Sequence, residues 1–392
     1  MKNLILTIIG AASILSTCAP KQESMTQLQK RVFKVAAEQV KITDARLGEK
    51  ELPRSIKDGQ AWNSDFKWWC SGFFPGTAWY TYEVTGDEEV KEIAMKNTLK
   101  LAEIPEKVDN HDIGFMIWCS YGNALRLTDD QNLLTTIEAA AKKLAARFHP
   151  NAGIIQSWGK NKEKDWICPV IIDNMMNLEL LEESARLFNN DSFAKIARTH
   201  ANNTIKNHFR EDYSTFHVVD YDPETGEVRH RVTHQGWADD SSWGRGQAWG
   251  LYGYTMMFRE SADSTYLRQA LKIADYCIPH LPEDGVTYWD FNAPDIPDAL
   301  RDASAAAVMA SALVELSTFA PCKSKAEEYR TVAEKIIRTL ASEEYLSAPG
   351  ENLGFLLKHS VGFLPVNSEV DVPLTYADYY FLEAIIRFNK AE

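Results

Sequence analysis

The sequence repeats one arrangement of helices about six times, and this repetition limits the folds that are open to the chain. Each repeat begins with a segment that is apolar on nearly all sides and continues, after a short turn, with an amphipathic helix. The apolar segments span residues 71–84, 112–127, 173–188, 243–260, 301–319 and 376–388. Helices that are apolar all round belong inside a protein, whereas amphipathic helices have one face suited to water. We therefore expect about twelve helices in six pairs.

A closed ring of helical hairpins, the (α/α)6 barrel, accommodates this pattern without leaving an apolar edge exposed. The opening helical segment, which contains Val32, Phe33, Ala36 and Val40, is expected to pair with the last apolar helix. An open solenoid is the alternative, but its terminal repeats are typically polar, whereas the last segment, YADYYFLEAII, is strongly apolar. The sequence has no alternation of strands and helices typical of a parallel sheet. The predicted fold class is therefore all-α.

Length and charge restrict the class of function. The chain has 392 residues, of which 45% are hydrophobic and 25% charged, as is ordinary for a globular protein. Its net charge of -13 argues against nucleic acid or an anionic membrane as the main partner, because such binding depends on basic patches. An anionic small substrate stays open, since a few local cations outweigh a distant negative field.

The first residues are typical of an export signal. Lys2 is followed by an apolar stretch over residues 4–15 and then by Ser16, Thr17 and Cys18, the order found in bacterial lipoprotein signals. We expect residues 1–18 to be a lipoprotein-type signal peptide with lipid attached to Cys18, residues 19–27 a linker, and residues 28–392 one catalytic domain. The protein is then exported, and is periplasmic or anchored to a bacterial membrane. The remaining cysteines have no CxxC spacing and predict neither disulfides nor zinc.

A single carboxylate interrupts the apolar segment at residues 167–181, ICPVIIDNMMNLELL. Met175, Leu178 and Leu181 recur at helical spacing, so a helix begins near Asp173 and holds this residue in its first turn. A buried carboxylate is costly unless it is hydrogen-bonded or functional, and Asp173 with Asn174 is also typical of a simple helix cap. This segment alone leaves both interpretations open.

Polar and aromatic residues recur at the starts of the apolar helices. In the barrel these starts lie at one end, so the loops before them, residues 65–70, 156–166 and 217–243, are expected to converge on one pocket. The residues at or beside the starts are Trp69, Asp112, Asp173, Arg245, Gln247, Asp302 and Tyr376. The carboxylates of Asp112 and Asp173, together with a fixed cation and aromatic rings, predict a sugar site. Arg245 is equally suited to an internal ion pair with Asp239, Asp240 or Asp302.

Six segments occur in the order WWCSGFFPGTAWYTYEVTGD, HDIGFM, IIDNMMNLELL, HQGWADDSSWGRGQAWGLYG, RDASAAA and YADYYFLEA. Together they resemble glycoside hydrolase family 88, the unsaturated glucuronyl hydrolases, from about residue 28 to the C-terminus. The resemblance implies an (α/α)6 barrel without metal or organic cofactor. It also implies removal of a 4,5-unsaturated uronic acid from the non-reducing end of lyase-generated oligosaccharides by hydration of the C4=C5 bond. The implied partners are chondroitin, hyaluronan, heparin or heparan fragments.

The resemblance assigns roles to particular residues. Asp173 in IIDNMMN matches the family's acid/base, and Asp112 in HDIGFM matches its second aspartate. The matched substrate-binding residues are His111, Trp69, Trp158, His217, Gln235, Arg245 and Trp249, with the tryptophans stacking on sugars and His217 positioning water and sugar. Residues 358–363, KHSVGF, do not match the family's contacts to the leaving sugar. We expect burial and repulsion from an ionised Asp112 to raise the pKa of Asp173 above about 3.9, against the helix dipole.

Three other functions remain compatible with parts of the sequence. An unsaturated rhamnogalacturonyl hydrolase shares the barrel and the chemistry but acts on pectin fragments, whereas SGFFPG and RGQAWGLYG favour family 88. A non-catalytic glycan-binding lipoprotein needs neither Asp112 nor Asp173. A sugar epimerase relies on paired histidines in the funnel, where this chain has His111, His217 and His234.

Overall fold

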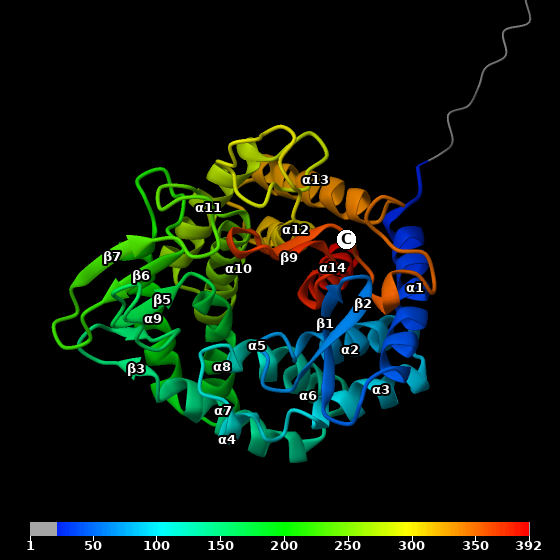
Figure 1. Ribbon diagram of the computed structural model, residues 1–392, viewed down its shortest axis with the longest axis horizontal. Helices are drawn as coiled ribbons and strands as arrows, with labels where there is room; N and C mark the ends of the chain where they lie inside the picture. Colours follow the sequence, from blue (N-terminus) through cyan, green and yellow to red (C-terminus); the bar gives the residue numbers. More distant parts are fainter. Residues whose placement is uncertain (1–21, 392) are drawn as a thin grey trace, which may run out of the picture.

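The computed structural model describes residues 22–391, and within this range the helices form a closed double ring (Figure 1). The inner ring contains α2 (Phe73–Thr85), α5 (Ile113–Ile117) with η1 (Trp118–Gly122) and α6 (Asn123–Thr128), α8 (Asn174–Leu187), α10 (Gly244–Ser261), α12 (Ala303–Phe319) and α14 (Thr375–Lys390). Each inner helix contacts the next around the ring, and α14 returns to α2. This closure confirms the predicted (α/α)6 barrel and excludes the open solenoid.

The outer ring covers the inner one. It contains α1 (Met25–Ala45), α3 (Glu88–Leu99), α7 (Leu134–Ala145), α9 (Asp191–His208), α11 (Ser264–His280) and α13 (Lys323–Leu340), with α4 (Ile104–Lys107) and η2 (Gln131–Leu133) in the connections. In α12 every residue from Ala303 to Val314 is buried, whereas α13 buries only residues at helical spacing, from Tyr329 to Leu340. The helices that are apolar all round therefore lie inside, as the sequence pattern predicts.

The first helix begins earlier than predicted. The Ser24 side chain accepts a hydrogen bond from the backbone N–H of Gln27 (3.2 Å), and the Gln27 side chain accepts one from the backbone N–H of Ser24 (2.9 Å), so α1 starts at Met25. The predicted linker, residues 19–27, is therefore wrong from Met25 onward. The predicted signal peptide, residues 1–18 with Cys18, lies outside the described residues. From residue 22 to residue 391, no helix is both long and apolar enough to cross a membrane.

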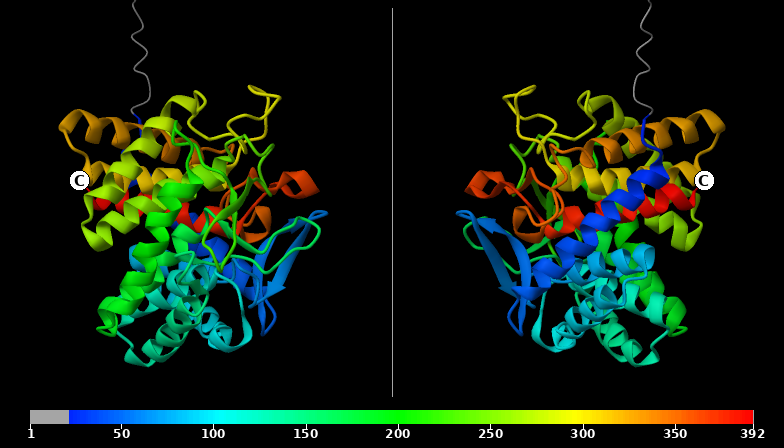
Figure 2. Two further views of the ribbon diagram at one scale, coloured as in Figure 1. Left: turned by 90° about the vertical axis from the view of Figure 1, so that its left-hand side faces the viewer. Right: turned by 90° about the vertical axis from the view of Figure 1, so that its right-hand side faces the viewer.

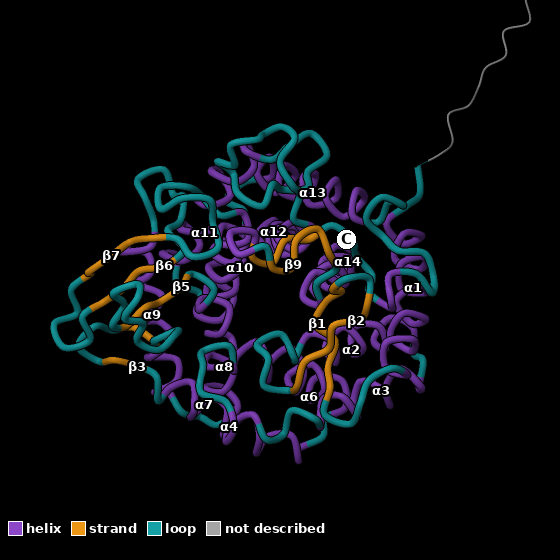
Figure 3. Tube along the Cα trace, in the orientation of Figure 1, coloured by secondary structure: helices purple, strands orange, loops and turns teal. Residues whose placement is uncertain are grey.

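Short antiparallel strands, which the sequence pattern did not predict, shape the loops between the helices (Figure 3). The pairs are β1 (Glu51–Lys57) with β2 (Gln60–Asp65), β3 (Phe148–His149) with β4 (Ile154–Ile155), β5 (Cys168–Ile171) with β6 (Val218–Tyr221), β6 with β7 (Val228–Val232), and β8 (Ser360–Phe363) with β9 (Ser368–Val372). The β1–β2 and β8–β9 hairpins project from the same end of the ring (Figure 2). The inner helices begin at this end, so the hairpins surround the helix starts.

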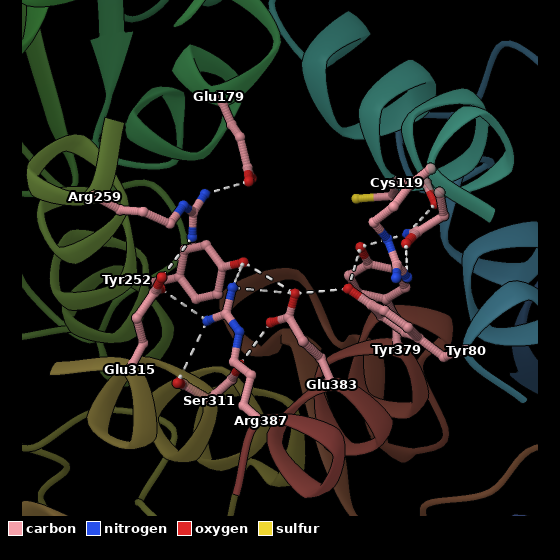
Figure 4. A network of polar contacts seen from close by, with 12 residues as sticks. Tyr80, Cys119, Glu179, Tyr252, Arg259, Ser311, Glu315, Tyr379, Glu383 and Arg387 are labelled. Carbon is pink, nitrogen blue, oxygen red and sulfur yellow. Dashed lines mark hydrogen bonds and ion pairs between the residues drawn. The ribbon is translucent and has the colours of Figure 1, made fainter. Parts of the chain in front are cut away.

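A network of polar contacts joins four inner helices below their first turns (Figure 4). The Glu383 carboxylate of α14 accepts hydrogen bonds from Tyr80 of α2 (2.8 Å), Tyr252 of α10 (3.1 Å) and Ser311 of α12 (2.6 Å). Arg387, one turn further along α14, lies 3.4 Å from Glu383. Because Glu383 is only 5% exposed, these contacts are stronger than they would be in water. The network therefore stabilises the packing of these four helices in the inner ring.

Glu383→Gln removes the charge and one of the two acceptor oxygens, so part of the network loses its acceptor and the Arg387 guanidinium keeps only Glu315 (3.0 Å) as an anionic partner. We expect this buried change to lower the free energy of unfolding by about 3 kcal/mol, measured by urea unfolding. The control is Glu327→Gln on α13, whose ion pair with Lys323 (3.8 Å) is largely exposed and should contribute less than about 1 kcal/mol. Equal and small effects for the two variants would contradict a stabilising network.

Candidate active site

Asp112 and Asp173 occupy the N-cap positions of α5 and α8, but neither side chain caps its helix. Asp302, at the start of α12, does cap, because its carboxylate accepts a hydrogen bond from the backbone N–H of Ser304 at 3.0 Å. The interpretation as a simple helix cap therefore holds for Asp302 and is wrong for Asp112 and Asp173. The carboxyl groups of these two residues are free to act on other groups.

A close approach of α5 and α8 brings the two carboxyl groups together. A Cβ atom at Gly114 would lie 2.5 Å from the Cα of Asn177, so only glycine fits between these helices. The side-chain oxygen of Asn177 accepts a hydrogen bond from the backbone N–H of Phe115 (2.7 Å) and fixes the contact. Burial, and next the charge of Asp173, raise the pKa of Asp112 to about 8.

The register of the β5–β6 pair places His217 opposite Ile172 and so beside Asp173. Ile171 pairs with Val218, and the backbone N–H of Ile172 donates to the His217 carbonyl at 3.1 Å. The Nε2 atom of His217 consequently lies 3.8 Å from Oδ2 of Asp173. The strand pairing thus makes neighbours of two predicted site residues that are far apart in the sequence.

The hydrogen bonds of His217 determine which ring nitrogen carries its proton. The Nδ1 atom accepts the backbone N–H groups of His234 and Gln235, both at 3.1 Å, which assigns the proton to Nε2. Burial holds the pKa of His217 well below 6.5, so the ring is neutral. His217 therefore presents an N–H donor, and not a positive charge, toward Asp173.

Burial also controls the acidity of Asp173. It raises the pKa of this carboxyl from 3.8 to about 7, against the opposing effects of the Arg245 charge and the Trp249 indole. The predicted direction is confirmed, but the predicted contribution of Asp112 is not. The repulsion between the two acids raises the pKa of Asp112, whereas burial is what raises that of Asp173. Near neutral pH the pair therefore retains protons that exposed aspartates would have lost.

His111 supports Asp112 from inside the protein. It is 0% exposed, its Nε2 atom lies 3.4 Å from Oδ1 of Asp112, and its Nδ1 atom lies 3.5 Å from Nδ2 of Asn177. Burial lowers the pKa of His111 to about 3, so its ring is neutral. The contact that the structure shows for His111 is with Asp112, and its predicted binding of substrate stays a prediction.

The three predicted tryptophans differ in how much ring surface they expose. Trp249 is 0% exposed and packs against Phe115 with ring centroids 5.3 Å apart, and its predicted stacking on a sugar stays a prediction. Its indole lowers the pKa of Asp173 and so acts on the acid directly. Trp69 and Trp158 are partly exposed, and their stacking on sugars stays a prediction.

Arg245 and Gln235 both hold strand β8. Arg245 donates to the carbonyls of Val361 and Gly362 and lies 3.0 Å from Oδ2 of Asp302, while Nε2 of Gln235 donates to the Gly362 carbonyl at 3.0 Å. The predicted internal ion pair of Arg245 is thus confirmed, with Asp302 as the partner. Arg245 is 1% exposed, so its visible role is to anchor β8 beside the helix starts. Direct contact of Arg245 or Gln235 with substrate stays a prediction.

Sequence reasoning did not single out Gly114 and Asn177, although both position the acids. Each lies within a segment that carries the family resemblance, Gly114 in HDIGFM and Asn177 in IIDNMMN. A glycine inside an apolar helical pattern signals a close approach of another backbone. That signal was present at Gly114, but the pattern did not say which helix approaches.

Comparison with known proteins places the chain in a family. The model of Glycosyl Hydrolase Family 88 matches residues 37–376. The chain belongs to this family. It is 44% identical over 352 residues to an unsaturated glucuronyl hydrolase of Formosa agariphila, covering 88% of this chain and 87% of that protein.

Two further relatives of family 88 are similar over most of their length. An unsaturated chondroitin disaccharide hydrolase of Streptococcus agalactiae is 35% identical over 326 residues, which cover 82% of this chain and 81% of that protein. A crystal structure of an unsaturated glucuronyl hydrolase specific for heparin is 46% identical, with a TM-score of 0.89 and coverage of 93% of this chain and 97% of that one. The resemblance read from the sequence is confirmed, and the chain is a glycosidase.

The predicted absence of metals and cofactors stays a prediction. Within residues 22–391, no group of three or more His, Cys, Asp and Glu side chains is arranged to hold a metal ion. The cysteines of this range, Cys70, Cys119, Cys168, Cys277 and Cys322, are free.

Asp173→Asn should stabilise the fold most at alkaline pH. The folded protein keeps a proton on Asp173 up to about pH 7, whereas the unfolded chain releases it near 3.8, so wild-type stability falls as pH rises between these values. Asparagine carries no charge at any pH. We expect its gain in free energy of unfolding over wild type to be about 2 kcal/mol larger at pH 8 than at pH 5, measured by urea unfolding. An equal gain at both pH values would show that burial does not hold Asp173 protonated.

Proposed function

We propose that this chain is an unsaturated glucuronyl hydrolase, which removes 4,5-unsaturated glucuronic acid from the non-reducing end of lyase-generated glycosaminoglycan oligosaccharides. The observation that carries the proposal is the Asp173 carboxyl, which is buried, does not cap its helix and lies 3.8 Å from Nε2 of His217. A pKa of about 7 allows this group both to hold a proton at neutral pH and to release it. Asp173 is therefore suited to be the acid and then the base of one reaction.

The substrate determines what the acid has to do. An unsaturated uronate contains an enol ether, O5–C5=C4, which becomes an oxocarbenium-like cation when C4 takes a proton. Protonated Asp173 delivers that proton to C4, and its carboxylate then takes a proton from the water that attacks C5. The hemiketal formed at C5 is unstable, so it opens and expels the remaining sugar. One acid/base suffices, and the rules that relate carboxylate separation to stereochemistry at the anomeric carbon do not apply.

The neighbours of Asp173 suit both of its protonation states. The Nε2–H group of neutral His217 can donate a hydrogen bond to the Asp173 carboxylate or to the attacking water without adding a charge. A pKa of about 8 keeps Asp112 protonated at pH 7, so it offers a hydrogen-bond donor and does not repel the carboxylate of the uronate. Asp112 is therefore the group that holds the sugar, and Asp173 the group that moves the proton.

The relatives support glycosaminoglycan fragments as the substrate class. One relative of known structure is specific for heparin, and a relative from Streptococcus agalactiae is an unsaturated chondroitin disaccharide hydrolase. Both substrates present an unsaturated glucuronyl group next to an amino sugar. We propose that the present chain acts on substrates with this shared feature. We do not extend to it the preference of either relative for heparin or for chondroitin.

The proposed reaction predicts loss of the ultraviolet absorbance of the C4=C5 bond when the protein is mixed with lyase-generated disaccharides of chondroitin, hyaluronan or heparin. Asp173→Asn should lower kcat by at least about a thousandfold, because the acid and the base of the reaction are the same group. The fold of the variant is checked by circular dichroism and by its unfolding midpoint. Turnover close to wild type in Asp173→Asn would contradict the assignment of Asp173.

Two controls separate the proposed reaction from the alternatives. Loss of absorbance only with an unsaturated rhamnogalacturonan disaccharide would assign the chain to the pectin enzymes instead. Binding of the glycosaminoglycan disaccharides without any loss of absorbance would identify a glycan-binding protein. The free carboxyl groups of Asp112 and Asp173 argue against the second outcome, because a binding protein has no need of a buried acid.

We also infer that the protein is exported as a lipoprotein, on the support of Lys2, the apolar stretch at residues 4–15 and Cys18. Production of the full-length chain in a bacterium fed with labelled palmitate should label the wild type and leave Cys18→Ser unlabelled, with the wild type alone in the membrane fraction. Label on both variants, or on neither, would contradict attachment of lipid at Cys18.

A further inference from the structure

A cavity of about 640 Å³ opens at the end of the barrel where the inner helices end, opposite to the acid pair. Its walls come from η1 and from the later turns of α2, α6, α8, α10 and α14. Arg126, Arg186 and Lys390 at its rim are exposed, whereas Tyr80 and Glu383 at its bottom are buried. Small-molecule sites occupy about 300–1,000 Å³, so the cavity is large enough for a ligand of the size of a disaccharide.

A closed circle of aromatic rings separates this cavity from the acid pair. Four buried side chains from the first two turns of four inner helices form the circle: Phe73, Phe115, Trp249 and Tyr380. Around the circle, neighbouring ring centroids lie 5.2, 5.3, 5.6 and 5.9 Å apart. Asp173 precedes α8, whereas Glu183 of the cavity wall lies about 15 Å further along this helix. The cavity is therefore a different site from that of the acid pair.

Every cation that lines the cavity is already paired with an acid. The pairs are Arg126 with Glu83 (2.6 Å), Lys390 with Glu83 (2.8 Å), Arg186 with Glu183, Arg259 with Glu179, and Arg387 with Glu383 (3.4 Å). Figure 4 shows Glu179, Arg259 and Arg387 turned toward a common space from three different helices. A charged ligand would have to compete with one of these pairs, so the arrangement favours an uncharged ligand.

The paired side chains keep hydrogen-bonding groups that the pairing does not use. A guanidinium has five N–H donors and a carboxylate has about four acceptor positions, whereas Arg186 makes a single hydrogen bond, to Glu183. A hydroxyl group both donates and accepts, so it fits between an arginine and a carboxylate without displacing either of them. A ligand with several hydroxyl groups therefore matches this wall.

Trp118 adds an aromatic surface to the same cavity. It is partly exposed and begins η1, a π-helical turn within the inner ring. A Cβ atom at Gly122 would lie 2.8 Å from the Trp118 ring, so the ring rests against this glycine. π-Helical turns are rare and occur frequently at functional sites. A partly exposed indole in a polar cavity is suited to pack on the apolar face of a pyranose ring.

We propose that this cavity binds an uncharged saccharide of one or two pyranose rings, at a site distinct from the acid pair. The C–H face of a pyranose packs on Trp118, and its hydroxyl groups bind the paired arginines and carboxylates of the wall. The ligand thus differs in charge from the uronate that the acid pair is proposed to take.

The test uses the protein labelled with 5-fluorotryptophan, whose indole signals are followed by ¹⁹F NMR as cellobiose, lactose or N,N′-diacetylchitobiose is added. Trp118→Phe assigns the signal of Trp118. We expect at least one of the three disaccharides to shift this signal saturably, with a Kd of about 1 mM or below. Asp173→Asn should leave the titration unchanged, because the two sites are separate.

Two arginine variants test the polar wall. Arg186→Gln should weaken binding of the disaccharide about fivefold, because a ligand hydroxyl loses a charge-assisted hydrogen bond. The matched control is Arg268→Gln, an exposed arginine of α11 that does not line the cavity, and it should change Kd by less than about twofold. Equal Kd values for the two variants would contradict binding of the sugar by Arg186.

Three further outcomes would overturn the site. Absence of a Trp118 shift with all three disaccharides would show that no uncharged saccharide binds. Equal, non-saturating shifts of Trp118 and of Trp237, which is 53% exposed on a loop outside the cavity, would show only a general effect of sugar on exposed indoles. A shift with glucuronate or spermidine, but with none of the disaccharides, would show that the cavity takes a charged ligand instead.

Discussion

Burial of the Asp173 carboxyl without a helix-cap hydrogen bond is the constraint on which the rest of the site depends. A carboxylate in such surroundings costs free energy, so the group keeps its proton to about pH 7. A cation in direct contact with Asp173 would have stabilised its charged form, and the group would then have no proton to donate at neutral pH. One polar neighbour is instead a neutral His217, whose Nε2 atom lies 3.8 Å away and whose tautomer is fixed by two backbone N–H groups. The site therefore combines a buried acid with a neutral hydrogen-bond donor, which adds no positive charge that would ionise the acid.

The ring allows the protein to tolerate this unfavourable group. Deeper in the same ring, on other inner helices, the Glu383 carboxylate accepts hydrogen bonds from Tyr80, Tyr252 and Ser311, and Arg387 lies beside it. Such a satisfied network stabilises the fold, whereas the acid pair at the helix starts weakens it as pH rises. The residues that stabilise the fold thus lie deeper in the inner ring than the residues that carry out the reaction. This separation explains why Glu383 and Asp173, both buried acids, are expected to respond to substitution in opposite directions.

Much of the fold was predictable, because helices that are apolar all round have to lie inside and a ring with no bare edge encloses them. The location of the site followed from the helix starts. What the sequence could not show was which polar side chains face the interior: His111, Trp249 and Arg245 match the family motifs, yet packing buries them completely. The contact of His217 with Asp173 depends on the β5–β6 register, which no local pattern encodes. The β1–β2 hairpin did carry a signal, since Asp58 and Gly59 both have the positive φ angles that Asp-Gly turns favour.

The most direct test of this account is the pKa of Asp173 itself. The protein is labelled with carboxyl-¹³C aspartate, and its resonances are followed by NMR from pH 4 to pH 9, with Asp173→Asn used to assign the signal. The account predicts that the carboxyl signal missing from the variant is one that titrates near pH 7, because burial keeps Asp173 protonated. A titration midpoint near 4, the value of an exposed aspartate, would contradict the central claim, because an acid ionised at neutral pH has no proton to deliver to carbon.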